Sequence, residues 1–279
     1  MTKTWLITGS SRGFGRELAK AVLDSGDRVI ATARRPEQLD DLVREYGDHV
    51  RAVALDVTNA AAARAAVQTA LDEFGVLDVV VNNAGYANSS SIEETSDEDF
   101  RAQIETNLFG VVNVTKAALP VLRTQHSGHF IQFSSIGGRV GGTPGLGAYQ
   151  TAKFAVEGFS EVLNNEVKPF GIKVTIVEPG GFRTDWAGSS MRIAPVSEDY
   201  EQTVGWMIRY RESSGGKQPG DPARAAKIII DIVHLDDPPL RLLLGSDAVE
   251  LAEEASKARA AEAEKWADVS RSSDFPAGT

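Results

Sequence analysis

The chain alternates short, nearly continuous apolar runs with longer segments in which apolar positions recur at helical spacing. The short runs are rich in Val, Ile, Leu and Ala, which is typical of strands that helices cover on both faces. We predict seven strands, at Thr4–Thr8, Arg28–Ala33, Val50–Asp56, Val76–Asn82, His129–Ser134, Lys173–Glu178 and Leu240–Gly245.

The longer segments predict the helices. They lie at Gly13–Asp24, Pro36–Tyr46, Ala60–Phe74, Ser96–Leu122, Ala148–Val167 and Pro222–Val233. Regular alternation of strands and helices specifies right-handed crossovers and a parallel sheet. The fold class is therefore predicted as α/β: a doubly wound Rossmann-type parallel sheet of about seven strands with helices on both faces, in a single domain spanning 1–279.

Two stretches differ from this alternation. Residues 180–220 contain Gly, Pro and Ser, show no clear strand, and carry scattered apolar residues that suggest short helices. Segments of this length often form binding loops or lids, so we expect a substrate-binding loop here. Residues 246–279 predict a C-terminal helix over Ala248–Val269 and a loose tail over Ser270–Thr279.

Composition narrows the class of protein. The 279 residues carry a net charge of −10, which argues against nucleic acid or a membrane surface as partner, because both require a basic face. The sequence has no cysteine, no apolar run of about 20 residues and no apolar leader, so we expect a cytoplasmic protein. Its four histidines show no metal-ligand spacing, so no metal site is predicted.

A glycine-rich turn follows the first predicted strand, with the sequence Thr8-Gly9-Ser10-Ser11-Arg12-Gly13-Phe14-Gly15. Gly9 permits a sharp turn, Gly13 permits the backbone to approach a pyrophosphate, and Gly15 permits close packing of helix on sheet. The helix N-terminus then offers N–H groups and a positive dipole end to phosphates. The turn predicts dinucleotide binding.

The end of the second strand indicates which dinucleotide is bound. An acidic residue there would bind a ribose 2′-hydroxyl, but this chain has Arg34. A guanidinium binds a 2′-phosphate in a fork, so Arg34, with Arg12 as a second cation, predicts NADP(H) as the cofactor.

A tyrosine and a lysine four positions apart, Tyr149 and Lys153, lie at the start of the helix after the fifth strand. Residues at this spacing share a helix face. A nearby ammonium lowers the pKa of a phenol, which suits the phenol to proton transfer near neutral pH.

Ser134 and Ser135 end the fifth strand at the edge where open α/β sheets bind ligands. Asn107, in an apolar stretch of helix, is either a structural residue that bends the helix or part of a polar relay.

Together these motifs resemble the short-chain dehydrogenase/reductase family, in its compact branch. The motifs that carry the resemblance are Thr8–Gly15, Asn82–Gly85, Asn107, Ser135, Tyr149, Lys153 and Pro179-Gly180. The resemblance implies that Tyr149 is the general acid/base, that Lys153 lowers its pKa and binds the nicotinamide ribose, and that Ser135 polarises the substrate carbonyl. It implies that Asn107 holds a water linked to Lys153.

The cofactor-binding set follows from the turn, the arginines and the resemblance. It comprises Gly9, Ser11, Arg12, Gly13, Phe14, Gly15, Arg34, Asp56, Val57, Asn83, Ala84, Gly85, Tyr149, Lys153, Pro179, Gly180, Phe182 and Thr184. The function implied is hydride transfer between NADP(H) and a carbonyl or secondary alcohol, with a small hydrophobic substrate. Relatives often pair through the helices at Ser96–Leu122 and Ala148–Val167, so a homodimer or homotetramer is also implied.

One departure from the family pattern leaves the catalytic serine open. Fourteen positions separate Ser135 from Tyr149, one more than is usual, so Ser134 is an alternative to Ser135. A second alternative concerns the whole protein, because a non-catalytic dinucleotide sensor or scaffold could use the same fold. An epimerase or dehydratase is disfavoured by the short C-terminal region.

Overall fold

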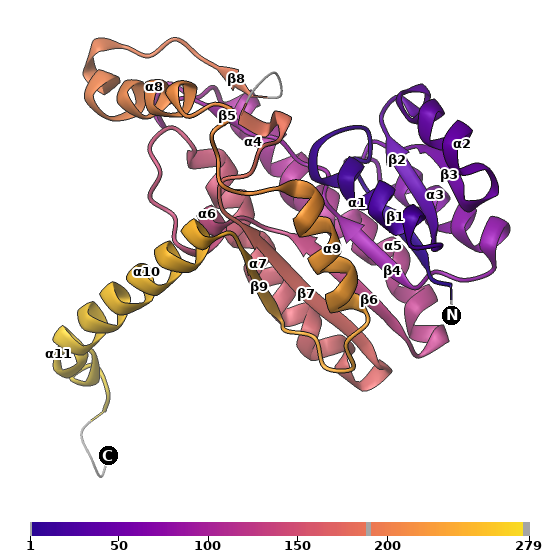
Figure 1. Ribbon diagram of the computed structural model, residues 1–279. Helices are drawn as coiled ribbons and strands as arrows, with labels where there is room; N and C mark the ends of the chain where they lie inside the picture. Colours follow the sequence, from indigo (N-terminus) through magenta and orange to yellow (C-terminus); the bar gives the residue numbers. More distant parts are fainter. Residues whose placement is uncertain (1, 188–190, 276–279) are drawn as a thin grey trace.

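A seven-stranded parallel sheet forms the centre of the molecule, in the order β3-β2-β1-β4-β6-β7-β9 (Figure 1). The computed structural model describes residues 2–187 and 191–275. The strands are β1 (Thr4–Ile7), β2 (Arg28–Ala33), β3 (Val50–Ala54), β4 (Val79–Asn82), β6 (Gly128–Phe133), β7 (Ile172–Pro179) and β9 (Arg241–Leu244). All six pairings are parallel, so the predicted fold class is confirmed.

Helices cover both faces of the sheet. The helices that pack on the sheet are α1 (Gly13–Asp24), α2 (Asp40–Tyr46), α3 (Ala60–Phe74), α5 (Gly110–Gln125), α7 (Gly147–Val167) and α9 (Pro222–Val233). One core joins α1, α2 and α9 to the first face, and a second core joins α3, α5 and α7 to the other. Successive side chains of a strand pack into the cores on opposite faces of the sheet: Trp5 and Ile7 belong to the first core, and Leu6 belongs to the second. Both faces are buried, which explains the continuous apolar runs.

The strand order reverses between β1 and β4, which defines a crevice at the carboxyl ends of the strands. The chain leaves β1 at Ile7, β4 at Asn82, β6 at Phe133 and β7 at Pro179, all at this edge. The glycine turn, Asn83 to Gly85, Ser134 and Ser135, and Gly180 follow these four strand ends directly. The topology therefore brings motifs that are far apart in sequence to one edge of the sheet.

Two predicted helices differ in detail from the observed ones. The segment at Pro36–Tyr46 begins as a 3₁₀ turn, η1 (Pro36–Leu39), before α2. The helix predicted over Ser96–Leu122 consists of α4 (Asp97–Ile104), a π-helical turn η3 (Glu105–Phe109) and α5. Single π turns inside α-helices are often found at functional sites.

Residues 180–220 contain the predicted short helices and one strand that was not predicted. The helices are η5 (Asp185–Ala187), η6 (Glu198–Tyr200), a π turn η7 (Glu201–Gly205) and α8 (Trp206–Ser213). A short strand, β8 (Arg192–Ile193), pairs in parallel with β5 (Asn88–Ser89), so the expectation of no strand was wrong. Residues 188–190 of this segment lie outside the described residues.

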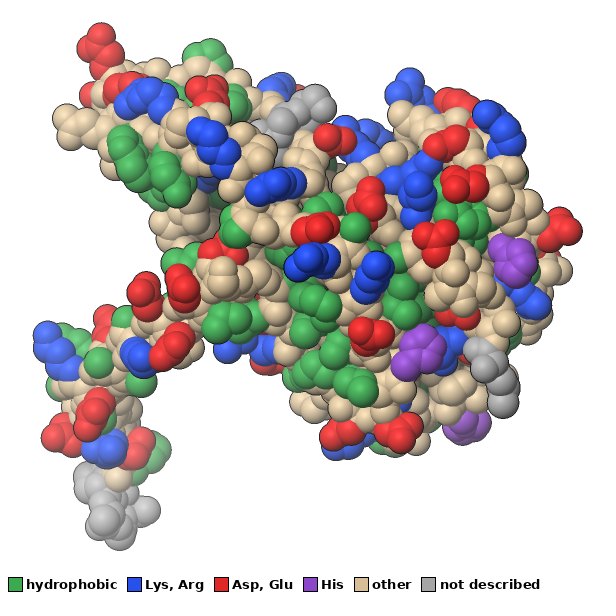
Figure 2. Space-filling view, viewed as in Figure 1, with side chains coloured by type: hydrophobic (Ala, Val, Ile, Leu, Met, Phe, Trp, Pro, Cys, Tyr) green, Lys and Arg blue, Asp and Glu red, His purple; other side chains and the backbone are tan. Residues whose placement is uncertain are grey.

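The C-terminal segment is helical as predicted, with α10 (Ser246–Lys265) followed by α11 (Ala267–Arg271). Figures 1 and 2 show this segment as an arm that leads away from the body. Only Ala248 and Ala252 of α10 are buried. The last part of the predicted tail, 276–279, lies outside the described residues. Across the described ranges, no helix is both long and apolar enough to cross a membrane.

Candidate active site

The glycine turn has the shape that a phosphate cradle requires. Gly9 has φ +71° and Gly13 has φ +55°, a region that other residues rarely adopt. A Cβ added to Gly15 would lie 2.3 Å from the carbonyl oxygen of Gly9. The N-cap residue of α1, Arg12, makes no side-chain cap. The first N–H groups of α1 therefore remain available to an anion, and these residues fit the pyrophosphate of a dinucleotide.

Thr8 links this turn to the end of β4 by hydrogen bonds. Its hydroxyl donates to the carbonyl oxygen of Val81 at 3.0 Å and accepts from the N–H groups of Asn83 and Ala84, at 2.9 and 3.0 Å. The Asn83 side chain donates to the carbonyl oxygen of Thr8 at 2.9 Å. The sequence placed Thr8 in the motif but gave it no role. The structure shows that it joins the two predicted cofactor segments.

The residues expected near the adenosine lie at the same edge. Asp56 follows β3, and its carboxylate accepts from the backbone and hydroxyl of Thr58 at 3.0 and 2.8 Å. Val57 packs against α5, where a Cβ added to Gly110 would lie 2.5 Å from it. Arg34 follows β2 and is exposed to solvent. The end of β2 therefore carries an exposed positive charge, as the predicted binding of a 2′-phosphate requires.

Tyr149 lies in the first turn of α7 and is 7 % exposed. Burial raises its pKa to about 12, and a hydrogen bond from the Ser135 hydroxyl acts in the opposite direction. The sequence predicted a lowered pKa because of the nearby Lys153. In the structure desolvation of the phenolate outweighs the other causes, so this prediction was wrong.

Lys153 is buried one helical turn after Tyr149 and lies close to it. Its ammonium donates to the carbonyl oxygen of Phe133, at the end of β6, over 2.6 Å. Its Nζ lies 5.7 Å from the centroid of the Tyr149 ring. Burial lowers the pKa of Lys153 to about 8. The two side chains predicted to act together are thus brought together.

Asn107 is fully buried in the π turn and holds the segment after β4. Its amide nitrogen donates to the carbonyl oxygens of Tyr86 and Gln103 at 2.8 and 2.9 Å, and its oxygen accepts from the N–H of Tyr86 at 3.0 Å. A Cβ added to Gly85 would lie 2.5 Å from the Asn107 oxygen and 3.8 Å from Lys153 Nζ. Asn107 therefore has a structural role, and Gly85 lies between it and Lys153; its part in a polar relay stays a prediction.

Ser134 and Ser135 face different surroundings. Ser135 caps the short helix α6 (Ile136–Arg139) by accepting from the N–H of Gly137 at 3.0 Å, which leaves its hydroxyl hydrogen for Tyr149. Ser134 is 4 % exposed, and its hydroxyl points to the carbonyl oxygen of Lys153 at 3.5 Å. The geometry favours Ser135 over Ser134 as the partner of the phenol.

The segment after β7 closes over the glycine turn. The Phe182 ring lies 4.8 Å from the Phe14 ring, which lies 5.5 Å from that of Phe133. A Cβ added to Gly13 would lie 3.7 Å from Thr184, so the glycine turn and Thr184 are neighbours. Asp247, at the start of α10, accepts from the N–H of Gly181 at 2.6 Å. The sequence gave no signal for this contact, which links positions 66 residues apart.

The apolar residues of the 180–220 segment divide into two groups. Trp186 packs on Tyr149 with ring centroids 5.2 Å apart, and Met191 packs on the same small cluster. Trp206 and Tyr210 instead stack on each other, and both are more than half exposed, at 53 % and 56 %. The first group therefore forms a wall beside the phenol, whereas the second lies at the surface.

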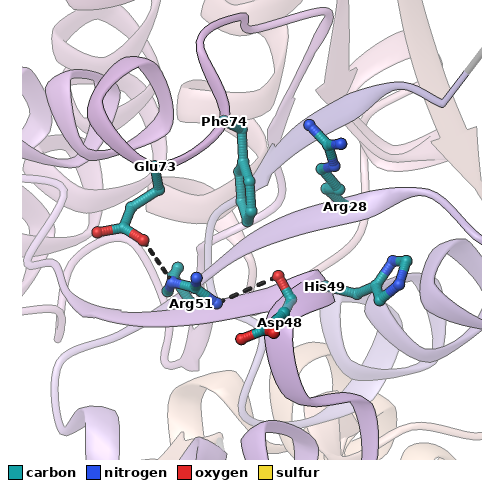
Figure 3. A pocket seen from close by; sticks show the side chains of 6 residues that line it. All are labelled: Arg28, Asp48, His49, Arg51, Glu73 and Phe74. Carbon is teal, nitrogen blue, oxygen red and sulfur yellow. Dashed lines mark hydrogen bonds and ion pairs between the residues drawn. The ribbon is translucent and has the colours of Figure 1, made fainter.

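A separate hollow of about 320 Å³ lies at the opposite edge of the sheet (Figure 3). Arg28 and Arg51, at the amino ends of β2 and β3, both lie over the ring of Phe74, at 5.5 and 5.4 Å from its centroid. Arg51 also pairs with Glu73 at 2.6 Å. The hollow contains none of the predicted catalytic or cofactor residues, so it is distinct from the candidate active site.

Another group of charges is structural. Glu178 is fully buried on β7 and pairs with Arg139 at 3.2 Å and Arg241 at 2.7 Å, and Arg241 also pairs with Glu157 and Glu161. Burial raises the pKa of Glu178. Neither in this group nor elsewhere in the described ranges do three His, Asp or Glu residues gather in a way that could hold a metal ion.

Comparison with known families and proteins identifies the family of this chain. The model of the short chain dehydrogenase family matches residues 3–192. The chain is 53 % identical over 274 residues to "Oxidoreductase BOA17" of Botryotinia fuckeliana, covering 98 % of this chain and 100 % of that protein. It is 38 % identical to a 3-ketodihydrosphingosine reductase of Bacteroides thetaiotaomicron over 86 % of this chain and 87 % of that protein.

Solved structures show the same likeness. A short-chain dehydrogenase from Streptomyces avermitilis superposes with a TM-score of 0.92 at 42 % identity, covering 99 % of this chain and 100 % of that one. An alcohol dehydrogenase from the archaeon Thermococcus sibiricus, complexed with 5-hydroxy-NADP, superposes with a TM-score of 0.71 at 28 % identity, covering 88 % and 96 %.

Proposed function

Because the chain belongs to the short-chain dehydrogenase/reductase family and is an oxidoreductase, we propose that it transfers a hydride between NADP(H) and a carbonyl or secondary alcohol. The observation that carries this proposal is the position of Lys153, whose Nζ lies 5.7 Å from the centroid of the Tyr149 ring, together with Ser135, which lowers the pKa of the same phenol. These groups lie at the same sheet edge as the glycine turn. A proton donor and a dinucleotide cradle therefore face one crevice.

The chemistry follows from the residues. When bound, the reduced nicotinamide supplies a hydride to the carbonyl carbon. Tyr149 donates its hydroxyl proton to the carbonyl oxygen, which becomes the alcohol oxygen, and Ser135 holds that oxygen by a hydrogen bond. At a pKa of about 12 the phenol is protonated at neutral pH, as reduction requires. Lys153 would supply positive charge beside the phenolate that remains.

Turnover with a conservative variant tests the proposal. NADPH consumption is measured across a panel of aldehydes and ketones for the wild type and for Tyr149→Phe. We expect turnover in the wild type and its loss in the variant, without loss of NADPH binding. A wild type that binds NADPH but is inert toward every carbonyl and alcohol would favour the dinucleotide-sensor alternative.

The roles of the two serines are tested in the same assay. Ser135→Ala should lower kcat by about 10²- to 10³-fold, which is typical for loss of one hydrogen bond to the developing charge. Ser134→Ala is the matched control, since Ser134 points to the backbone of Lys153. A larger loss in Ser134→Ala than in Ser135→Ala would reassign the catalytic serine.

The preference for NADP(H) is proposed on the charge at the adenosine end. Arg12 and Arg34 are both exposed, and neither takes part in an ion pair within the described part of the chain. Both guanidinium groups are therefore available to a 2′-phosphate. The NADP derivative bound by the Thermococcus sibiricus relative supports this assignment.

Binding measurements with both cofactors test this part. We expect NADPH to bind more tightly than NADH, and Arg34→Asp to remove or reverse the difference. Arg44→Asp, which makes the same charge change at a solvent-facing position of α2, should retain it. Equal affinities in the wild type would refute the NADP(H) assignment.

The remaining predicted site residues complete the proposal. Asn107 would hold water near Lys153, and Pro179, Gly180, Phe182 and Thr184 would bind the nicotinamide end. Phe182 contacts Phe14 of the glycine turn, and an added Cβ on Gly13 would lie near Thr184, which supports that placement. The continuous sheet supports a single domain over 1–279. We retain the proposals of a cytoplasmic homo-oligomer and a hydrophobic substrate bound against Trp186.

A further inference from the structure

Arg211 of α8 is a half-buried cation with no carboxylate to balance it. None of the ion pairs among the described residues includes Arg211. The eight residues outside the described ranges include no Asp or Glu. Burial lowers the pKa of Arg211, with no neighbouring carboxylate acting in the opposite direction. An uncompensated guanidinium in this position is costly unless an anion arrives to pair with it.

The contacts of Arg211 reach the two segments that flank Tyr149. Its guanidinium donates to the Ser89 hydroxyl at 3.3 Å and to the carbonyl oxygen of Pro144 at 3.4 Å. Ala87 and Leu146, each two positions from one of these acceptors, belong to the same buried cluster as Tyr149. Arg211 is therefore joined to the two segments that contribute Ala87 and Leu146 to the cluster around Tyr149.

The helix that carries Arg211 is held in place over this region. Arg211 joins α8 to β5 through its hydrogen bond to Ser89, and Figure 1 draws α8 well apart from α1, which follows the glycine turn. A Cβ added to Gly145 would lie 2.8 Å from the Ser89 hydroxyl and 3.2 Å from Val204, which belongs to the π turn before α8. Close packing here fixes the start of α8, and so fixes the position from which Arg211 extends.

The guanidinium also has unused hydrogen-bonding capacity. A guanidinium has five N–H donors, and the described residues provide only the two long hydrogen bonds to Ser89 and Pro144. Its planar fork matches the two oxygens of a carboxylate. The Ser89 hydroxyl beside it could hydrogen-bond the same group.

We propose that Arg211 binds an anionic group of the substrate, so that the substrate is a carbonyl compound with a carboxylate separated from the reacting carbon by an apolar body. This inference rests on the proposed function and refines its substrate class. The carbonyl would lie at Tyr149 and Ser135, the apolar body against Trp186, and the carboxylate at Arg211 and Ser89.

Matched pairs of acids and esters test the proposal. The substrates are 4-acetylbenzoate and 5-oxohexanoate, each compared with its methyl ester, which has the same carbonyl without the charge. We expect the wild type to show a kcat/KM about 10- to 100-fold higher for at least one acid than for its ester, mainly through KM. Equal values within both pairs would overturn the proposal.

Variants of α8 then locate the origin of the preference. Arg211→Met should bring the acid-to-ester ratio close to one, and Arg211→Lys should retain part of it. Arg209→Met removes a guanidinium from the same helix at a position that is 57 % exposed and paired with Glu201, so the ratio should stay at the wild-type value. A ratio that survives in Arg211→Met would overturn the role of Arg211. If that variant does not fold, the acid-to-ester ratios of the wild type and of Arg211→Lys still test the role of Arg211.

Failure of this inference can be distinguished from failure of the proposed function. An enzyme that reduces the esters and acids equally keeps the function and loses the anion site. If no carbonyl is reduced, the anion site is tested separately, by calorimetric measurement of the binding of 4-acetylbenzoate to the protein with NADPH. Binding to the wild type that is lost in Arg211→Met and retained in Arg209→Met would support the anion site, and absence of binding to the wild type would overturn it.

Discussion

Lys153 should make the protein more stable as pH rises above neutrality. Burial holds its pKa at about 8 in the folded protein, against 10.5 when it is exposed. Below pH 8 the lysine is charged in both the folded and the unfolded chain, so the folded state bears the full cost of desolvating the ammonium. Between pH 8 and 10.5 the folded state has released this proton while the unfolded chain still binds it. The free energy of unfolding therefore increases with pH in this window.

The magnitude follows from the two pKa values. The contribution of this one group to the free energy of unfolding rises by about 1 kcal/mol between pH 7 and 9, and by about 2–3 kcal/mol by pH 10. The raised pKa of Tyr149, about 12 instead of 10.0, has the opposite sign: it reduces stability above pH 10. Between pH 7 and 9 the free energy of unfolding therefore reports the titration of Lys153 without a contribution from Tyr149.

Urea unfolding of the cofactor-free protein at several pH values provides the assay. The wild type is compared with Lys153→Met, which has no titrating group at this position, and with Lys227→Met, which removes an exposed ammonium from α9. We expect the difference between the wild type and Lys153→Met to change by about 1 kcal/mol in favour of the wild type from pH 7 to 9. Lys227→Met should follow the wild type. A constant difference between the wild type and Lys153→Met would refute the reasoning.

Three further substitutions test the architecture of the site. Gly15→Ala places a methyl group 2.3 Å from the carbonyl oxygen of Gly9, so NADPH affinity measured by fluorescence and the Tm should both fall; wild-type affinity would contradict the close packing of α1 on the turn. Asn107→Leu removes three hydrogen bonds to backbone groups and should cost about 3 kcal/mol or more in urea unfolding, and a loss under about 1 kcal/mol would argue against the clamp on Tyr86. Thr8→Val leaves the N–H groups of Asn83 and Ala84 without their acceptor and should cost about 1–3 kcal/mol, whereas an unchanged free energy of unfolding would show that this link is dispensable.

The sequence predicted the sheet and the positions of the motifs because both depend on local patterns. Strands buried on both faces are continuous apolar runs, and a motif that follows such a run must lie at the carboxyl edge of a parallel sheet. Tyr149 and Lys153 share a helix face wherever α7 packs. These features depend little on contacts between distant segments, so the pattern along the chain was sufficient.

The features that the sequence did not predict depend on contacts between distant segments. The pairing of β5 with β8 joins two-residue strands across 104 positions, and no apolar run marks either of them. The π turn contains Asn107, and the side chain of Asn107 hydrogen-bonds the backbone N–H and carbonyl oxygen of Tyr86, which follows β4. Arg211 is one of several arginines in its segment, and only the packing of α8 distinguishes it from the exposed Arg209.

The pKa of Tyr149 shows how burial can reverse an inference from spacing. A lysine four positions away predicts a more acidic phenol, but the ammonium of Lys153 is hydrogen-bonded to the carbonyl oxygen of Phe133, and the phenol is desolvated in an apolar cluster. The same burial makes both charged forms costly, but at a pKa of about 8 Lys153 stays mostly protonated at neutral pH, where Tyr149 is fully protonated. Charge that develops on the phenol during a reaction would be stabilised most by a protonated Lys153, since their interaction is strong in a site that excludes water. At neutral pH the two shifted pKa values therefore leave a neutral Tyr149 beside a mostly charged Lys153, and the two form an ion pair only while the phenol has lost its proton.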